Sequence, residues 1–153
     1  MAVFESNQFD TGNHEVGPHS AGETYVQEAT LTVTAAAAND VFKMHVIPPA
    51  CVPVDVVCYL QDLDTGATLV WDMALLNAAG TDVTASTEII DASTVGQAKG
   101  VQRANCINLK KSFTVDEDSE QYLAAKVRTG VTGLNASKVF RSIMTYRASE
   151  YGV

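Results

Sequence analysis

The chain has 153 residues and a formal net charge of −8, from 10 Lys and Arg against 18 Asp and Glu. That length suffices for one domain with its own core, and only 18% of the residues are charged, against roughly 25% in an average soluble domain. The longest basic run is Lys110-Lys111, so binding to nucleic acid or to an anionic membrane surface is not expected. The low charge content instead favours a surface partly covered by a protein partner.

Cysteine content and hydropathy indicate the compartment. Cys51, Cys58 and Cys106 leave at least one thiol unpaired, and the N-terminus has no charged segment followed by an apolar one. No apolar stretch approaches the roughly 18 residues of a membrane span. We therefore expect synthesis in a reducing cytoplasm.

Residues 1–24 differ in character from the remainder of the chain. The stretch SNQFDTGNHEVGPHSAGE (residues 6–23) is rich in Gly, Asn, Ser and His and shows neither helical nor strand periodicity. It predicts an extended N-terminal arm whose backbone hydrogen bonds come from a partner surface, with a loosely ordered terminus as the alternative. The candidate contact residues of this arm and of the strand that follows it are Phe4, Phe9, His14, Val16 and Tyr25.

From Tyr25 onward, apolar residues recur with a period of two, which is typical of half-buried β-strands. In the first such stretch, Ala29, Leu31 and Val33 fall on one face and polar residues fall on the other. The segments with this pattern are residues 25–35, 41–49, 52–62, 67–76, 121–130 and 138–148, with one or two further strands expected within residues 104–115.

One segment, residues 88–100, breaks the strand pattern. Asp91 or Ser93 can cap a short helix that runs through Ala98 and stops at Gly100. About eight antiparallel strands with one short helix predict an all-β fold. We expect a jelly-roll-like β-sandwich that occupies residues 25–153 as a single domain behind the arm.

The tripeptide Asp-Thr-Gly occurs twice, at residues 10–12 and 64–66, and an aspartic protease carries its catalytic carboxylates in this motif. Acid proteolysis needs two carboxylates about 3 Å apart that share one proton. The two copies have unrelated flanking sequences, and the apolar pair at residues 89–90 is followed by Asp91 where a retroviral protease needs Gly. We therefore expect no catalytic residue and interpret residues 64–66 as a hairpin turn, with Asp64 in water or capping the turn.

No other segment carries a recognisable catalytic or metal-binding motif. His14, Glu15 and His19 lie close in sequence, but Gly17 and Pro18 exclude a helical pair of ligands. We expect no metal and no cofactor.

The remaining candidates are expected in ordinary strand positions. His45 should lie on the polar face of its strand, while Cys58 and Trp71 should face the core. Tyr59 and Tyr151 are the aromatic residues that look free to meet a carbohydrate.

Taken together, the order of segments resembles that of the small jelly-roll proteins that decorate or cement the capsids of tailed bacteriophages. The stretches that carry the resemblance are residues 35–66, with the ANDV turn, the Pro-Ala loop and the acidic DLDTG; residues 93–105; and the closing MTYRA at residues 144–148. The resemblance spans most of residues 25–148.

This resemblance implies a virion structural protein without enzymatic activity, seated on the capsid exterior and made in the cytoplasm of the bacterial host. Its partners would be the major capsid protein and copies of itself, as a dimer or trimer. The predicted arm would reach onto a neighbouring subunit. A head-fibre or tail component of the same fold and a carbohydrate-binding β-sandwich are the alternatives.

Overall fold

The computed structural model of the protein describes residues 1–7, 24–105, 118–135 and 137–148. Within these residues the structure is all-β, and none of them belongs to a helix long and apolar enough to span a membrane. The strands are β1 (Val3–Glu5), β2 (Thr24–Val33), β3 (Val41–Ile47), β4 (Cys51–Leu60), β5 (Val70–Leu75), β6 (Ile90–Ser93), β7 (Gly100–Arg103), β8 (Gln121–Thr129) and β9 (Lys138–Ala148).

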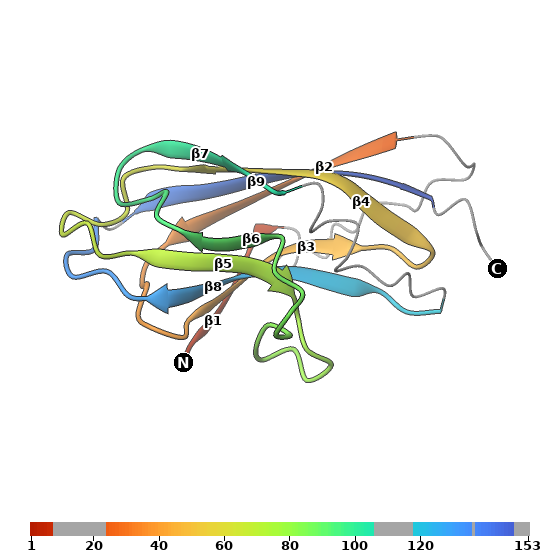
Figure 1. Ribbon diagram of the computed structural model, residues 1–153, viewed down its shortest axis with the longest axis horizontal. Coiled ribbons are helices and arrows are strands. Elements are labelled where there is room, and N and C mark those ends of the chain that lie inside the picture. The colour runs from red at the N-terminus through yellow and green to blue at the C-terminus, as the bar shows by residue number, and fades with distance from the viewer. Residues whose placement is uncertain (8–23, 106–117, 136, 149–153) are drawn as a thin grey trace.

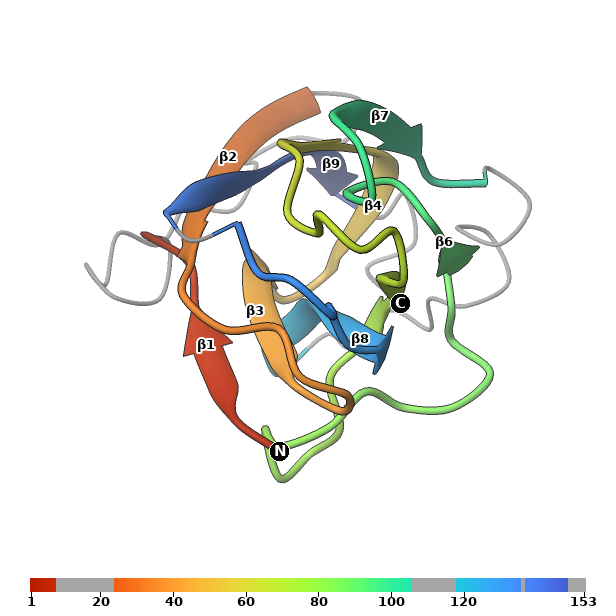
Figure 2. The same ribbon diagram turned by 90° about the vertical axis from the view of Figure 1, so that its left-hand side faces the viewer.

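The described strands form two sheets stacked face to face (Figure 1). One sheet has five strands in the order β1-β3-β8-β5-β6, and the other has four in the order β2-β9-β4-β7. The antiparallel pairs β2–β9, β3–β8, β4–β7 and β5–β6 are nested in sequence, as if one long hairpin had been rolled up. This arrangement is a jelly roll, seen along its strands in Figure 2, and the predicted fold class is confirmed.

The core lies between the sheets and follows the period-two pattern of the sequence. In β2, Ala29, Leu31 and Val33 are buried, as the alternation predicts. Trp71 of β5 and Phe140 of β9 meet across the core with ring centroids 5.2 Å apart. Because large aromatic side chains bury the most apolar area per residue, this contact between the sheets makes a large contribution to their association.

The first strand belongs to this chain's own sandwich. β1 pairs in parallel with β3, and the amide of Ser6 donates to the carbonyl of Lys43 over 2.9 Å. The ring of Phe4 packs against Phe42 with centroids 5.5 Å apart, and the Ser6 hydroxyl donates to the carbonyl of Met44 over 2.7 Å. Residues 3–5 are therefore an edge strand of the five-stranded sheet, while residues 8–23 lie outside the described residues.

The short helix predicted within residues 88–100 is wrong. Residues 90–93 form β6 and pair with β5, and the β-branched Ile90 is buried against the core. Asp91, expected as a helix cap, instead forms an ion pair with Arg128 over 2.7 Å. Gly96 has a φ of 108°, which a helix does not allow.

The hairpin predicted at residues 64–66 is also wrong, because β4 and β5 lie in different sheets. Alternation shows which residues of each strand face the core, but both sheets share that core, so alternation does not reveal to which sheet a strand belongs. The segment is a crossing from one sheet to the other. The strands predicted within residues 104–115 fall almost wholly outside the described residues.

Replacing Phe4 by alanine should lower the free energy of unfolding by about 1–3 kcal/mol, because the ring is partly buried against Phe42. The matched control is Val3→Ala, since Val3 is 38% exposed on the same strand. Urea unfolding of the three proteins measures the difference. Equal stability of Phe4→Ala and Val3→Ala would show that β1 contributes no packing to the sandwich.

Candidate functional site

The second Asp-Thr-Gly segment lies at an end of the sandwich where several loops cross between the sheets, on the left of Figure 1. The amide of Leu63 donates to the carbonyl of Gly96 in the β6–β7 loop over 2.8 Å. The amide of Thr65 donates to the carbonyl of Gly133 in the β8–β9 loop over 2.9 Å. The β4–β5 loop is therefore in contact with two other crossings.

Both oxygens of the Asp64 carboxylate are saturated with hydrogen bonds. Three donors reach Oδ1 and three reach Oδ2, at distances from 2.6 to 3.3 Å. The donors are the amides of Gly66, Thr68, Leu69, Thr132 and Gly133 and the hydroxyl of Thr68. Asp64 is buried, so its carboxylate supplies acceptors to backbone amides of the loops that have no partner in a β-sheet.

The same loop accounts for the residues next to Asp64. A Cβ atom at Gly66 would clash with the side chain of Thr132, so a residue without a side chain is needed where the two loops touch. Ala67 has a φ of 53°, a left-handed conformation that is unfavourable for alanine. The hydrogen bonds to Asp64 on either side of Ala67 hold this turn in place.

The electrostatics of Asp64 fit a structural role. Desolvation alone would raise the pKa of this carboxyl, but the hydrogen bonds from Gly66, Thr68 and Leu69 together hold it well below its usual range. A carboxylate of an acid protease shares a proton with its partner, whereas a carboxylate with six donors resists taking one. Of the two predicted places for Asp64, the one in water is wrong because the residue is buried, and the capping of its own turn is confirmed. The carboxylate also binds the β8–β9 loop. Asp10 lies outside the described residues.

A second polar cluster lies inside the sandwich and was missed from the sequence. His45 on β3 is fully buried, with Nδ1 2.9 Å from Oε1 of Gln27 and Nε2 2.9 Å from the hydroxyl of Ser142. The Ser142 hydroxyl also lies 3.5 Å from the thiol of Cys58. The cluster joins β3 of one sheet to β2, β4 and β9 of the other.

The expected place of His45 on a polar face is wrong, and a β-bulge is the reason. The β3–β8 register shifts between Lys43 and His45, so the neighbours Met44 and His45 are both buried instead of alternating. The burial expected for Cys58 and Trp71 is confirmed. A histidine in a regular strand pattern gives no sign of a bulge, so the sequence carried no signal for this position.

Burial determines the chemistry of this cluster. It lowers the pKa of His45 from its ordinary value of 6.5 to about 3, so the imidazole is neutral at pH 7. With Gln27 Oε1 as acceptor, Nδ1 carries the proton and Nε2 accepts from Ser142. Burial also raises the pKa of the Cys58 thiol to about 12, against a smaller opposing effect of the Ser142 hydrogen bond. A protonated thiol and a neutral imidazole away from solvent form a structural hydrogen-bond network, with no access for a substrate.

Only two of the five predicted contact residues fall within the described part of the chain. Phe4 and Tyr25 are partly buried and pack against the core, on β1 of one sheet and β2 of the other. The ring of Tyr25 lies 6.0 Å from that of Tyr146. Their packing against this chain's own core neither supports nor opposes a contact with a partner, and the remaining three, Phe9, His14 and Val16, lie outside the described residues.

The outer face of the four-stranded sheet carries exposed apolar side chains. Val26 on β2 is 61% exposed, Val101 on β7 is 57% exposed, and Val54 and Tyr59 on β4 are each 40% exposed. Val26 and Tyr59 stood at outward positions of predicted strands, where an apolar residue was the signal. Val54 lies at the register shift between Pro53 and Asp55, and Val101 lies in β7, a strand that the sequence did not predict. The charged residues between them are paired: Arg103 binds Asp55 through two hydrogen bonds of 2.8 Å, and Arg141 lies 2.6 Å from Glu28.

A groove of about 400 Å³ opens on this face beside Tyr59 and Val101, with Lys99 and Arg141 among its lining residues. The Arg141 guanidinium lies over the Tyr59 ring, 5.8 Å from its centroid. A second hollow, of about 720 Å³, lies beside Lys43 and Glu120 at the five-stranded sheet. Because charges of both signs line the second hollow, it shows no preference for one class of ligand.

Comparison with known proteins supports a role in a virion. No known protein family and no curated protein matches the sequence. The fold is similar to that of a chain in the capsid of Ralstonia phage GP4, with a TM-score of 0.82, 29% sequence identity, and coverage of 96% of this chain and 98% of that one. It is also similar to a chain in the capsid asymmetric unit of cyanophage Pam1, with a TM-score of 0.58, 18% identity, and coverage of 86% and 89%.

The second of these similarities shows the fold alone, whereas the first extends over nearly the full length of both chains. The expected resemblance to phage capsid proteins is thereby confirmed. It supports a structural role in a virion.

Replacing Asp64 by asparagine should lower the free energy of unfolding by about 2–4 kcal/mol, because an amide NH₂ would face donors that now meet a carboxylate oxygen. The control is Asp62→Asn, two residues earlier on the exposed surface, which should change stability by less than about 0.5 kcal/mol. We expect no peptide cleavage by the wild type. Cleavage that is lost in Asp64→Asn would overturn the structural interpretation of this residue.

The pKa of His45 predicts acid sensitivity. Because its folded pKa of about 3 lies below the ordinary 6.5, stability is full above pH 6.5 and falls as the pH drops towards 3. The slope from this residue is about 1.4 kcal/mol per pH unit, so wild type should lose about 2 kcal/mol more than His45→Gln between pH 6.5 and roughly pH 5. Urea unfolding at several pH values tests this. Parallel profiles of the two proteins would contradict it.

Proposed function

We propose that this chain is a decoration or cement protein, which binds the outside of a phage head and staples neighbouring capsid subunits without enzymatic activity. The observation that carries the proposal is the similarity to a chain of the Ralstonia phage GP4 capsid over nearly the whole length of both chains. The protein would be made in the host cytoplasm and reside on the virion exterior. Its partners would be the major capsid protein and further copies of itself.

The side chains that resemble catalytic groups form hydrogen bonds within the fold, and this supports a structural role. Asp64 has its acceptor positions filled by backbone donors, and His45 is enclosed between the sheets. The three or more His, Cys, Asp or Glu side chains needed to hold a metal ion do not come together among the described residues. Among the described residues, Asp64 and His45 are therefore not placed to react with a substrate.

The mechanism proposed for stapling is burial of apolar and backbone surface between subunits. A shell contains many copies, so a modest free energy at each contact adds up over the particle. The predicted arm, residues 1–24, would extend such contacts onto a neighbouring subunit through Phe9, His14 and Val16. Because β1 and Asn7 bind within this chain's own sandwich, the contact with a neighbour is proposed for residues 8–23.

The described surface offers little to a carbohydrate ligand. Tyr59 is exposed, as predicted, but the Arg141 guanidinium lies over its ring, on a face that a sugar would need for stacking. Tyr151, the other candidate, lies outside the described residues. A head-fibre or tail component of the same fold is the alternative to a head decoration protein, and particle binding separates the two.

Purified protein should co-sediment with phage capsids assembled without it, and should raise the temperature at which those capsids rupture. The expected reason is that each bound copy must be released before neighbouring capsid subunits separate. Sedimentation and light scattering during a temperature ramp measure binding and rupture. Binding to isolated tails but not to capsids would favour the tail component, and binding to neither would refute the proposal.

A further inference from the structure

The two outer faces of the sandwich differ in what covers them. Of the six large apolar side chains exposed among the described residues, four lie on the four-stranded sheet: Val26, Val54, Tyr59 and Val101. On the five-stranded sheet, the outward-facing Ala74 and Ala124 are fully buried beside one another. In Figure 1 the loop that follows β5 hangs below that sheet, and Lys126 of β8 binds Asp82 of this loop over 2.8 Å.

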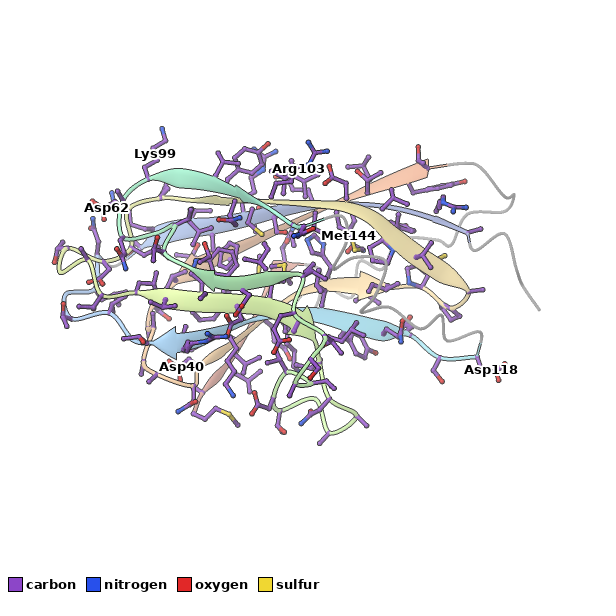
Figure 3. All side chains as sticks on the ribbon, viewed as in Figure 1. Asp40, Asp62, Lys99, Arg103, Asp118 and Met144 are labelled. Atoms are coloured by element: carbon purple, nitrogen blue, oxygen red, sulfur yellow. The ribbon has the colours of Figure 1, made fainter. Side chains whose placement is uncertain are left out.

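The groove on the four-stranded sheet is built by neighbouring positions on three strands. Val101 of β7 pairs with Tyr59 of β4, which in turn pairs with Arg141 of β9. Lys99 also lines the groove, together with Leu60, Gln61, Gly100 and Val139. Figure 3 shows Lys99 and Arg103 pointing away from the sandwich on this side.

The charge of the groove is opposite to that of the chain. Its lining contains two cationic residues, Lys99 and Arg141, and no acidic one, although the chain as a whole carries a net charge of −8. Arg141 is already paired with Glu28, whereas no ion pair is formed by Lys99 with any described residue. An occupant with a carboxylate next to apolar side chains would therefore complement both the apolar walls and the free ammonium group.

We propose that the outer face of the four-stranded sheet docks on the capsid protein, and that the groove beside Tyr59 and Val101 receives an acidic side chain of that protein flanked by apolar ones. The inference rests on the proposed function and adds which face meets the shell. A two-fold contact of this groove with its copy on a second chain is disfavoured, because it would bring the Lys99 ammonium groups of both copies together and the groove lining offers neither of them a carboxylate.

The test measures binding of variants to phage capsids assembled without this protein. Val101→Glu places a carboxylate where the partner's carboxylate would lie, and should weaken binding about tenfold or more. Ala85→Glu is the matched control, because it adds the same charge at an exposed position of the loop over the other sheet, and should bind like wild type. Thermal unfolding of each variant verifies that the fold is intact, as expected from the 57% exposure of Val101.

A second variant tests the acidic character of the partner. Lys99→Glu should also weaken capsid binding about tenfold at roughly 0.1 M salt, and its difference from wild type should shrink as salt screens the charges. Binding by Lys99→Glu that is unchanged or tighter would overturn the acidic occupant.

The outcomes separate the inference from the function on which it rests. If wild type binds capsids and Val101→Glu binds equally well, the docking face is wrong while the decoration function stands. If wild type does not bind at all, both fail. If wild type is an oligomer in the absence of capsids and Val101→Glu makes it monomeric by analytical ultracentrifugation, the face is a contact between copies and the inference is overturned.

Discussion

The carboxylate of Asp64 is the constraint on which one end of the jelly roll depends. A rolled-up hairpin must cross repeatedly between its sheets, and each crossing leaves backbone amides without strand partners. Asp64 accepts from five such amides, in its own loop and in the β8–β9 loop, while Leu63 ties the same segment to Gly96 of the β6–β7 loop. The Asp64 side chain thereby satisfies backbone amides of two loops at the end of the sandwich, beyond the last β-sheet pairs.

Two buried polar groups stabilise the fold, Asp64 as a charged carboxylate and His45 as a neutral imidazole. Acid weakens the contribution of both. Hydrogen bonds hold the pKa of Asp64 well below its usual range, so its stabilising effect is lost as the pH falls and the carboxylate takes a proton. Burial lowers the pKa of His45 to about 3, so acid favours the unfolded chain, in which the imidazole is free to charge. Both groups make the folded sandwich strongest near and above neutral pH.

The long strands could be predicted from the sequence because a half-buried strand is the structure that places alternate residues on opposite faces, whereas the remaining features depend on the tertiary structure. The short β6 was mistaken for the start of a helix because it contains Asp91 and Ser93, which are also good helix caps. Alternation does not show the bulge that buries His45, nor the sheet to which β5 belongs. Of the candidate site, the sequence indicated Asp64 as a turn former, but its partners in the β8–β9 loop lie 68 and 69 residues away.

The two outer faces of the sandwich differ in how much apolar surface they expose. The five-stranded sheet covers its outward alanines with the chain's own loop, while the four-stranded sheet pairs its arginines across strands and leaves Val26 and Val101 in contact with solvent. A protein that stays free in solution gains no stability from exposing valine on one sheet. A protein that attaches to a surface does gain, because attachment buries those side chains, and the paired arginines keep the face soluble until then.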